Sequence, residues 1–282
     1  MKIILNLIIL LSIIILFVTG INYINLNKEN FNNNLDMNLL KNSTVLIKNN
    51  MRSIDWNNPR DSIDSGMGSG SGFFIDKNHI LTNYHVISNY SFLSVKLPNV
   101  NSSKNYECEV ISVYPELDIA LLRIKDYESK YYLELSTSDE DSLVGSSAYA
   151  VGYPLGMEQI KVSAGIINGI QDGHLQIDTP INPGNSGGPL INKDMKVIGI
   201  IFATLMFTDN IGFSIPINYV NNLLDQMKSP PTIPYVIYKP TLGISYSNTS
   251  DDYMDILGLC NSGVTVDQVL KNGPVDNNIK NW

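Results

Sequence analysis

The sequence has few histidines, few cysteines and no long run of positive charge. Its 282 residues include three histidines, His79, His85 and His174, and two cysteines. Two cysteines cannot build a disulfide scaffold, and no group of Cys and His has the spacing of a zinc site. The net charge of −8 argues against nucleic-acid binding through phosphate neutralisation. We therefore expect no metal, no organic cofactor and no nucleic-acid partner, and any imidazole chemistry must use one of the three histidines.

Charged residues are also scarce, at 16% of the chain, whereas apolar residues make up 44%. This composition excludes a fully disordered chain, because it supplies enough apolar side chain to build a core. At roughly 150 residues per domain, the length predicts one or two domains.

The first 21 residues form a nearly unbroken apolar run behind a positive charge. Lys2 is followed by residues 3–18, which are almost entirely Ile and Leu and have no polar face. The run is shorter than the roughly 20 residues that span a bilayer comfortably. It predicts a signal peptide cleaved after Gly20, or an uncleaved membrane anchor that extends through Ile21, with a buried core helix as a third alternative. A signal peptide or a membrane anchor would make the rest of the chain extracytoplasmic: secreted, periplasmic, lumenal or anchored to a membrane.

Residues 22–42 are rich in Asn and predict a polar tether with little to bury. From about Ser43 the pattern changes to short β-type runs separated by turn residues. Strands this short and frequent predict an all-β barrel or sandwich rather than a parallel α/β sheet. The predicted strands are Gly72–Ile75, Ile80–Asn83, Ser94–Leu97, Glu109–Val113, Ile119–Ile124, Ala148–Val151, Val162–Ile167, Leu175–Ile177, Val197–Phe202 and Gly212–Ile215.

One helix is predicted, over Ile217–Met227, where apolar residues recur at i, i+3, i+4 and i+7. Three prolines within residues 230–234 predict a stiff connector over residues 229–240, which follows a domain spanning residues 43–228. Residues 241–282 are too few to predict a confident independent core.

The most informative segment is residues 184–190, Gly-Asn-Ser-Gly-Gly-Pro-Leu. A serine hydroxyl is a weak nucleophile unless a base takes its proton, and its attack on a carbonyl builds charge that needs preorganised N–H donors. Glycines around Ser186 let successive N–H groups point at one place. The segment therefore predicts a catalytic serine, although a Gly-rich structural turn is the alternative.

The general base must be one of the three histidines. His79 and His174 fall in predicted turns, whereas His85 directly follows a predicted strand, which can hold a side chain in place. A catalytic histidine also needs a carboxylate that fixes its tautomer. Asp118 is the lone acid beside a long apolar run, where a carboxylate is costly unless it is paired. We predict that His85 and Asp118 serve Ser186.

The order His85, Asp118, Ser186 and its contexts resemble trypsin-like serine proteases of chymotrypsin fold, and more closely the HtrA (DegP, Do-like) branch. The resemblance covers roughly Thr44 to Met227. The resembling segments are Gly68–Phe73, Leu81–Val86, Leu117–Leu122, Val151–Pro154, Ser163–Ile167, Ile181–Leu190 and Gly212–Pro216.

The resemblance implies a chymotrypsin-like double β-barrel followed by a C-terminal helix, with the catalytic triad between the barrels. It implies that the backbone N–H groups of Gly184 and Ser186 form the oxyanion hole. Asn185 replaces the Asp that pairs with a new N-terminus in digestive relatives, so we expect no such zymogen step. Homotrimers are common in the family, but no trimer signature is readable in this sequence.

The resemblance also implies an apolar substrate pocket lined by Ile181 and Ala203. Pro180 stands six residues before Ser186, where trypsin-type enzymes place an Asp for Lys or Arg recognition. We therefore expect cleavage after small or branched aliphatic residues.

The tail resembles the opening half of a PDZ domain, and the chain stops about halfway through it. Leu242, Gly243 and Ile244 would correspond to its peptide-binding loop and first pairing strand, a surface that adds a peptide to a sheet edge. The alternative is a truncated remnant that binds nothing.

The sequence as a whole predicts an extracytoplasmic serine endopeptidase that degrades unfolded or damaged polypeptides. Two alternatives stay open: a non-catalytic chaperone or peptide-binding protein on a protease fold, and an inactive product of a truncated gene. A broken triad would favour the first alternative, and the sequence shows none.

Overall fold

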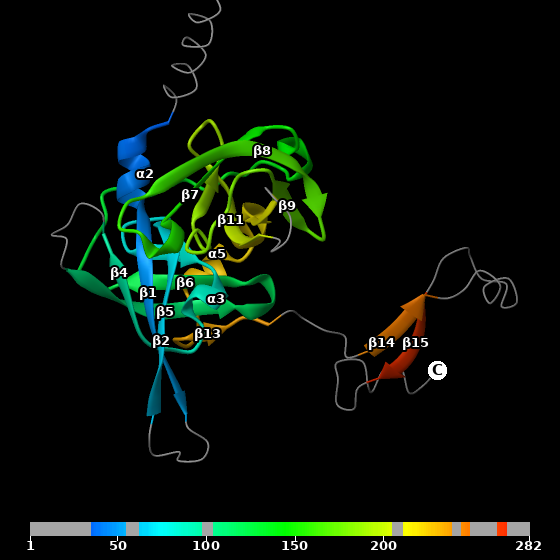
Figure 1. The fold of residues 1–282 in the computed structure, drawn as a ribbon. Coiled ribbons are helices and arrows are strands. Elements are labelled where there is room, and N and C mark those ends of the chain that lie inside the picture. Colours follow the sequence, from blue (N-terminus) through cyan, green and yellow to red (C-terminus); the bar gives the residue numbers. More distant parts are fainter. Residues whose placement is uncertain are drawn as a thin grey trace, which may run out of the picture. The chain divides into compact units, whose positions relative to one another are not determined.

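The computed structural model describes residues 35–54, 62–97, 104–204, 211–238, 244–248 and 264–269. The chain divides after Ile237 into two units, the larger built from two β-barrels and the smaller from a two-stranded sheet (Figure 1). No helix within the described residues is long and apolar enough to cross a membrane. The predicted signal peptide or anchor of residues 1–21 lies outside those residues.

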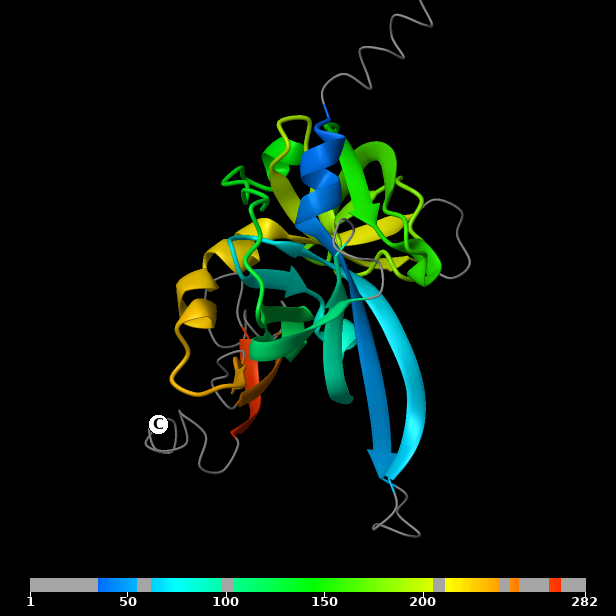
Figure 2. The ribbon, with the colours of Figure 1, turned by 90° about the vertical axis from the view of Figure 1, so that its left-hand side faces the viewer.

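Six antiparallel strands close into the first barrel. They are β1 (Thr44–Ile54), β2 (Ser62–Phe74), β3 (His79–Thr82), β4 (Tyr90–Lys96), β5 (Asn105–Tyr114) and β6 (Ile119–Ile124). Their order is β5-β4-β1-β2-β3-β6, and β5 closes the ring by pairing with β6 as well as with β4. β1 and β2 form a long hairpin that projects beyond the barrel (Figure 2).

Six further strands close into the second barrel, in the order β10-β11-β12-β9-β8-β7. They are β7 (Ser147–Gly152), β8 (Lys161–Gln171), β9 (His174–Ile177), β10 (Pro189–Ile191), β11 (Val197–Thr204) and β12 (Gly212–Pro216). The predicted all-β double barrel is confirmed.

The core between the barrels explains why β6 has an almost uninterrupted apolar sequence. Ala120 and Leu122 face the core inside the first barrel, where they are fully buried. Leu121 points the other way, into a core that it shares with Val151 and Ile200 of the second barrel. A strand that is buried on both faces loses the alternation of apolar and polar residues. This shared core fixes the two barrels against each other, and the candidate site depends on loops from both.

The helix α2 (Met37–Ser43) precedes β1 and corrects the expected tether. Asp36 caps it, because its Oδ1 accepts hydrogen bonds from the backbone N–H groups of Asn38 and Leu39. Leu40 is fully buried in the core between the barrels. The packed domain therefore begins before residue 43, and at least the last part of residues 22–42 is not a polar tether.

The predicted C-terminal helix is present as two short helices, α4 (Ile217–Asn221) and α5 (Leu224–Lys228). The helix is interrupted after Asn221 and Asn222. Asn is a poor helix former because its side chain competes for backbone hydrogen bonds. Here Asn221 Nδ2 donates to a carbonyl outside the helix, Ser136 O, at 2.8 Å. Val220 and Met227 are fully buried, so the predicted apolar face is correct although the helix is not continuous.

The proline-rich segment is only partly a connector. Within it, β13 (Tyr235–Val236) pairs in parallel with β5, and the Ile237 N–H donates to Val113 O at 2.8 Å. The larger unit therefore extends to Ile237, beyond the boundary predicted at residue 228. In the smaller unit, β14 (Ile244–Asn248) pairs antiparallel with β15 (Val264–Val269).

Candidate active site

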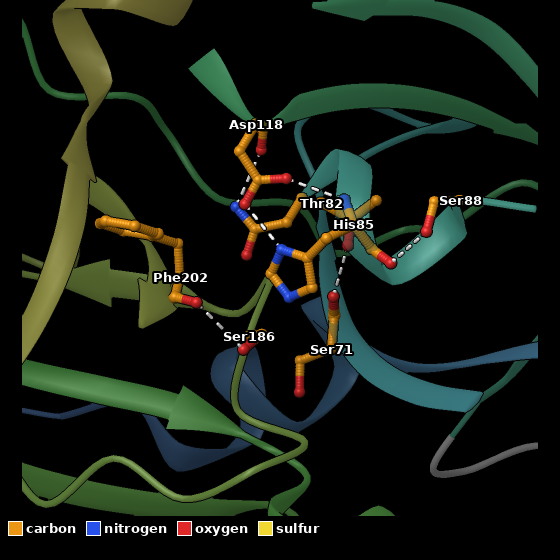
Figure 3. A network of polar contacts seen from close by, with 8 residues as sticks. Ser71, Thr82, His85, Ser88, Asp118, Ser186 and Phe202 are labelled. Carbon is orange, nitrogen blue, oxygen red and sulfur yellow. Dashed lines mark hydrogen bonds and ion pairs between the residues drawn. The ribbon is translucent and has the colours of Figure 1, made fainter. Parts of the chain in front are cut away.

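His85 lies in a single turn of helix, α3 (Tyr84–Ile87), just after β3. Its Nδ1 is 2.6 Å from Asp118 Oδ2, and its backbone N–H donates to Asp118 Oδ1 at 2.8 Å. Because a carboxylate accepts hydrogen bonds, we assign the ring proton to Nδ1, which leaves Nε2 as an acceptor. Figure 3 shows the imidazole lying between Asp118 and Ser186. The structure thus brings together the three residues that the sequence predicts.

Asp118 has a left-handed backbone, with φ 54° and ψ 42°, at the end of a short 3₁₀ turn (Pro115–Leu117). Such a conformation is uncommon outside glycine, although Asp tolerates it better than most residues. Its carbonyl accepts hydrogen bonds from the Tyr84 N–H at 3.1 Å and from Asn83 Nδ2 at 3.0 Å. These two contacts tie the start of α3 to Asp118 and fix the carboxylate opposite the imidazole.

The loop that carries Ser186 depends on two glycines with left-handed φ values. Gly184 has φ +98°, and a Cβ there would lie 2.4 Å from Tyr153 O. Gly187 has φ +83°, and a Cβ there would lie 2.2 Å from both Ser71 O and Thr82 Oγ1. Only glycine meets both the backbone conformation and the close approach. The glycines of the motif therefore shape the loop around Ser186.

The hydroxyl of Ser186 faces the imidazole but is bonded elsewhere. Its Oγ donates to Phe202 O at 3.4 Å (Figure 3). Among the described residues, no hydrogen bond joins this hydroxyl to His85. Figure 3 shows the Phe202 carbonyl and the His85 ring on either side of this hydroxyl.

Two backbone N–H groups at Ser186 have no protein acceptor in the part of the chain that the structure describes: those of Gly184 and Ser186. The N–H of Asn185 between them donates to Asn182 O at 3.0 Å. N–H groups left free in this way, at alternate positions beside a nucleophile, can stabilise a developing oxyanion. These are the two N–H groups that the family resemblance implies for the oxyanion hole.

The chain is similar to known peptidases. The trypsin-like peptidase domain family matches residues 70–200. A probable periplasmic serine endoprotease, DegP-like, of Rickettsia conorii is 34% identical over 232 residues, which are 77% of this chain and 44% of that protein. The chloroplastic protease Do-like 1 of Arabidopsis thaliana is 34% identical over 231 residues, 76% of this chain and 50% of the relative.

The chain belongs to the HtrA/DegP (Do-like) family of trypsin-like peptidases. Two solved structures share its fold. The HtrA-type protease AlgW with a decapeptide has a TM-score of 0.66 and 22% identity, over 84% of this chain and 79% of that one. The serine endoprotease of Yersinia pestis has a TM-score of 0.63 and 23% identity, over 86% and 78%. The chain spans about half the length of the curated HtrA/DegP relatives described above.

The other two histidines lie outside the triad. His79 is the first residue of β3, and its Nδ1 is 3.0 Å from both carboxylate oxygens of Asp76 in the preceding turn. The His174 ring packs on the Phe202 ring, with centroids 4.7 Å apart. Within the described residues, neither of them is hydrogen-bonded to Asp118 or to Ser186. In the described part of the chain, no group of three or more His, Cys, Asp or Glu could hold a metal ion.

The predicted pocket residues are only partly described. Ile181 is half-buried, and a Cβ on Gly212 would lie 2.6 Å from its Cγ1, so the side chain covers Gly212 of β12. Ala203 lies on β11 opposite Phe213, and its side chain is outside the described residues. In the tail, Ile244 begins β14, whereas Leu242 and Gly243 lie outside the described residues.

Two residues of the site were missed from the sequence. Asn83 is fully buried and bonds the Asp118 carbonyl, and Ser71 of β2 is fully buried against the Ser186 loop. Both residues lie in segments that resemble the family, and Ser71 is the serine of a Gly-Ser-Gly sequence. That composition indicates close backbone packing at Ser71, but it does not reveal which groups the hydroxyl contacts.

Replacing Gly184 with alanine is expected to lower kcat for a peptide substrate by about 10²- to 10³-fold, the cost of losing one oxyanion donor. The added Cβ would lie 2.4 Å from Tyr153 O and 2.7 Å from the Leu155 nitrogen, so the peptide must shift. Gly145→Ala is the matched control, because Gly145 also has a positive φ, +80°, but no atom within 4 Å of a Cβ. Steady-state kinetics of both variants decide: equal losses would attribute the effect to backbone strain rather than to the displaced N–H.

Proposed function

We propose that this chain is a serine endopeptidase that hydrolyses peptide bonds of unfolded or damaged proteins. The observation that carries the proposal is the convergence of Asp118, His85 and Ser186 beside two N–H groups without a protein acceptor. Membership of a family of trypsin-like peptidases supports the same activity.

The proposed reaction uses these groups in turn. Ser186 Oγ forms a bond to the substrate carbonyl carbon while its proton passes to His85 Nε2, and the carbonyl π electrons move to the oxygen. The N–H groups of Gly184 and Ser186 would stabilise that oxyanion, and Asp118 the imidazolium. The imidazolium then protonates the amine as the C–N bond breaks, leaving an acyl-enzyme. Water repeats the sequence and releases the acid, restoring the Ser186 hydroxyl.

The proposed specificity is cleavage after small or branched aliphatic residues. It is supported by Ile181, whose side chain covers Gly212, and by the uncharged Pro180. We also propose an extracytoplasmic location, supported by the apolar N-terminal run and by relatives whose names place them in periplasm or chloroplast. A homotrimer, a membrane anchor and peptide binding by the tail stay predictions from the sequence and the family resemblance.

The test is cleavage of casein by the full chain purified in mild detergent, with and without diisopropyl fluorophosphate. This reagent forms a bond between the nucleophilic Oγ and phosphorus and expels fluoride, while the serine proton goes to the base. We expect casein fragments that disappear with the reagent, mass-spectrometric modification of Ser186, and new termini that follow small or aliphatic residues.

Two results would contradict the proposal. A folded protein that neither cleaves casein nor reacts at Ser186 would favour the alternative of a non-catalytic binding protein. Cleavage that persists when Ser186 is fully modified would assign the activity to another nucleophile or to a contaminating protease. Termini that follow charged residues would overturn the specificity alone.

A further inference from the structure

Ser71 of the first barrel makes two hydrogen bonds to the catalytic loop and accepts one from Tyr153, which follows β7. Its Oγ donates to Gly184 O at 2.7 Å and accepts from the Tyr153 N–H at 2.9 Å. Its backbone N–H donates to Ser186 O at 2.8 Å. Its own carbonyl accepts from Thr82 Oγ1 at 2.8 Å. Every polar group of Ser71 is therefore engaged, and two of them hold the residues expected to form the oxyanion hole.

These contacts determine the orientation of the peptide groups in the loop. In a trans peptide the C=O and the next N–H point in opposite directions. With the Gly184 carbonyl held by Ser71, the N–H of Asn185 points away, toward Asn182 O. With the Ser186 carbonyl also held by Ser71, the N–H of Gly187 points to Ile201 O at 2.8 Å. Ser71 thus fixes two peptide groups of the loop, Gly184–Asn185 and Ser186–Gly187.

The free N–H of Ser186 belongs to the peptide between these two, and the free N–H of Gly184 belongs to the peptide just before them. The carbonyl of Pro183 accepts from the Leu155 N–H at 2.5 Å, and that of Asn185 accepts from the Gly188 N–H at 2.9 Å. Four successive carbonyls are therefore anchored. A rotation of the peptide that contains the Gly184 or Ser186 N–H would require the neighbouring peptides to turn as well, against the hydrogen bonds to Ser71.

The surroundings of Ser71 leave no room for a side chain with an additional heavy atom. Ser71 is fully buried. A Cβ on Gly152 would lie 2.8 Å from Ser71 Oγ, and a Cβ on Gly188 would lie 3.3 Å from Ser71 Cβ. Three closely packed segments meet at this hydroxyl: β2, the end of β7 and the Ser186 loop. A buried hydroxyl with both a donor and an acceptor contact is costly to lose, because its former partners stay buried.

We propose that Ser71 is a positioning residue of the oxyanion hole, whose hydroxyl and N–H keep the N–H groups of Gly184 and Ser186 directed at one point. The inference rests on the proposed protease function. Ser71 itself touches neither substrate nor the reacting atoms, so it acts through the loop.

Ser71→Ala is expected to lower kcat by about 10- to 100-fold and to change KM by less than about twofold, because the oxyanion develops only in the transition state. A peptide boronic acid, whose tetrahedral adduct on Ser186 carries a negative charge, is expected to lose affinity by a similar factor. Steady-state kinetics and inhibition constants measure both effects in folded protein.

Ser112→Ala is the matched control. Ser112 lies on β5 of the same barrel, is fully buried, and its Oγ donates to Met227 O at 3.1 Å, far from the loop. Both variants lose a buried hydroxyl and a hydrogen bond to a carbonyl distant in sequence. We expect both to lower the melting temperature but only Ser71→Ala to lower kcat. Equal losses of kcat would reduce Ser71 to a structural residue.

Amide hydrogen exchange of residues 181–188 tests the positioning without turnover. We expect faster exchange in Ser71→Ala than in the wild type or Ser112→Ala. Unchanged exchange would overturn the inference, whereas a wild type that shows the protection but cleaves nothing would overturn the protease function alone. If Ser71→Ala does not fold, Ser71→Cys is the second variant, because its thiol retains a weak hydrogen-bond donor at the position. We expect its amide exchange rates and its kcat to lie between those of the wild type and those of Gly184→Ala. Wild-type values of both quantities would contradict the proposal.

Discussion

Replacing Ser186 with alanine is expected to lower kcat for a peptide substrate by about 10⁶-fold, and adding His85→Ala should lower it no further. The nucleophile and the base act in one step, so neither has a catalytic partner once the other is gone. Among the residues that the structure describes, the Ser186 hydroxyl makes one hydrogen bond, of 3.4 Å to Phe202 O. Its removal should therefore change the melting temperature by less than about 2 °C.

The measurement is kcat and KM of Ser186→Ala, His85→Ala and the double variant, each purified on fresh resin to exclude host proteases. Losses that multiply in the double variant would mean that the two residues act independently. Activity near the wild-type rate in Ser186→Ala would remove the serine from the mechanism. Thermal unfolding of the same samples shows whether the fold is intact.

Much of the double barrel could be predicted because its strands are short apolar runs. β6 spans Ile119–Ile124, as predicted, since both of its faces are buried. β1 was not among the predicted strands, because Lys48, Asn49 and Asn50 interrupt its apolar pattern. The Asn49 side chain is buried and its Nδ2 donates to the carbonyls of Val86 and Ser88, at 3.0 and 2.9 Å. Asn is disfavoured in strands, and only the tertiary contact with α3 accounts for it.

The triad could be predicted because each member has a recognisable context of its own. The supporting residues could not, because their bonds run to backbone groups far away in sequence. Ser71 and Gly184 are 113 residues apart, and Asn83 and Asp118 are 35 apart. The left-handed backbone of Asp118 likewise has no sequence signal apart from the tolerance of Asp for that conformation. Residue type therefore predicted the chemical groups, and the fold determines how they are held.

Asp118→Asn is expected to lower kcat by about 10⁴-fold, because it selects the wrong tautomer of His85. Asp118 Oδ1 accepts from the His85 backbone N–H at 2.8 Å, and Oδ2 from the ring Nδ1 at 2.6 Å. The His85 backbone N–H requires an oxygen at the Oδ1 position, so the amide nitrogen of Asn would occupy the Oδ2 position and face Nδ1. A donor there leaves Nδ1 as the acceptor and places the ring proton on Nε2, which then cannot take the Ser186 proton.

The chain contains a matched control in the Asp76–His79 pair. Asp76 Oδ1 accepts from the His79 backbone N–H at 2.9 Å, and the ring Nδ1 is 3.0 Å away. Burial raises the Asp76 pKa, but hydrogen bonds from Lys228, Asn78 and His79 outweigh it and lower the pKa to about 2. Asp76→Asn should therefore destabilise the fold above the ordinary carboxyl pKa and keep its kcat. The difference in stability from the wild type should shrink as pH falls from 3.8 through about 2, while the wild-type carboxylate becomes protonated.

Comparing the two Asp→Asn variants separates tautomer control from the loss of a half-buried charge. If the tautomer explanation holds, raising the pH will not restore Asp118→Asn to the wild-type rate, since Nε2 stays protonated in the favoured tautomer at any pH at which the imidazole is neutral. ¹⁵N chemical shifts of the His85 ring report the tautomer directly. A ring that keeps its proton on Nδ1 in Asp118→Asn, together with a kcat loss no larger than that of Asp76→Asn, would show that the carboxylate only supports the fold.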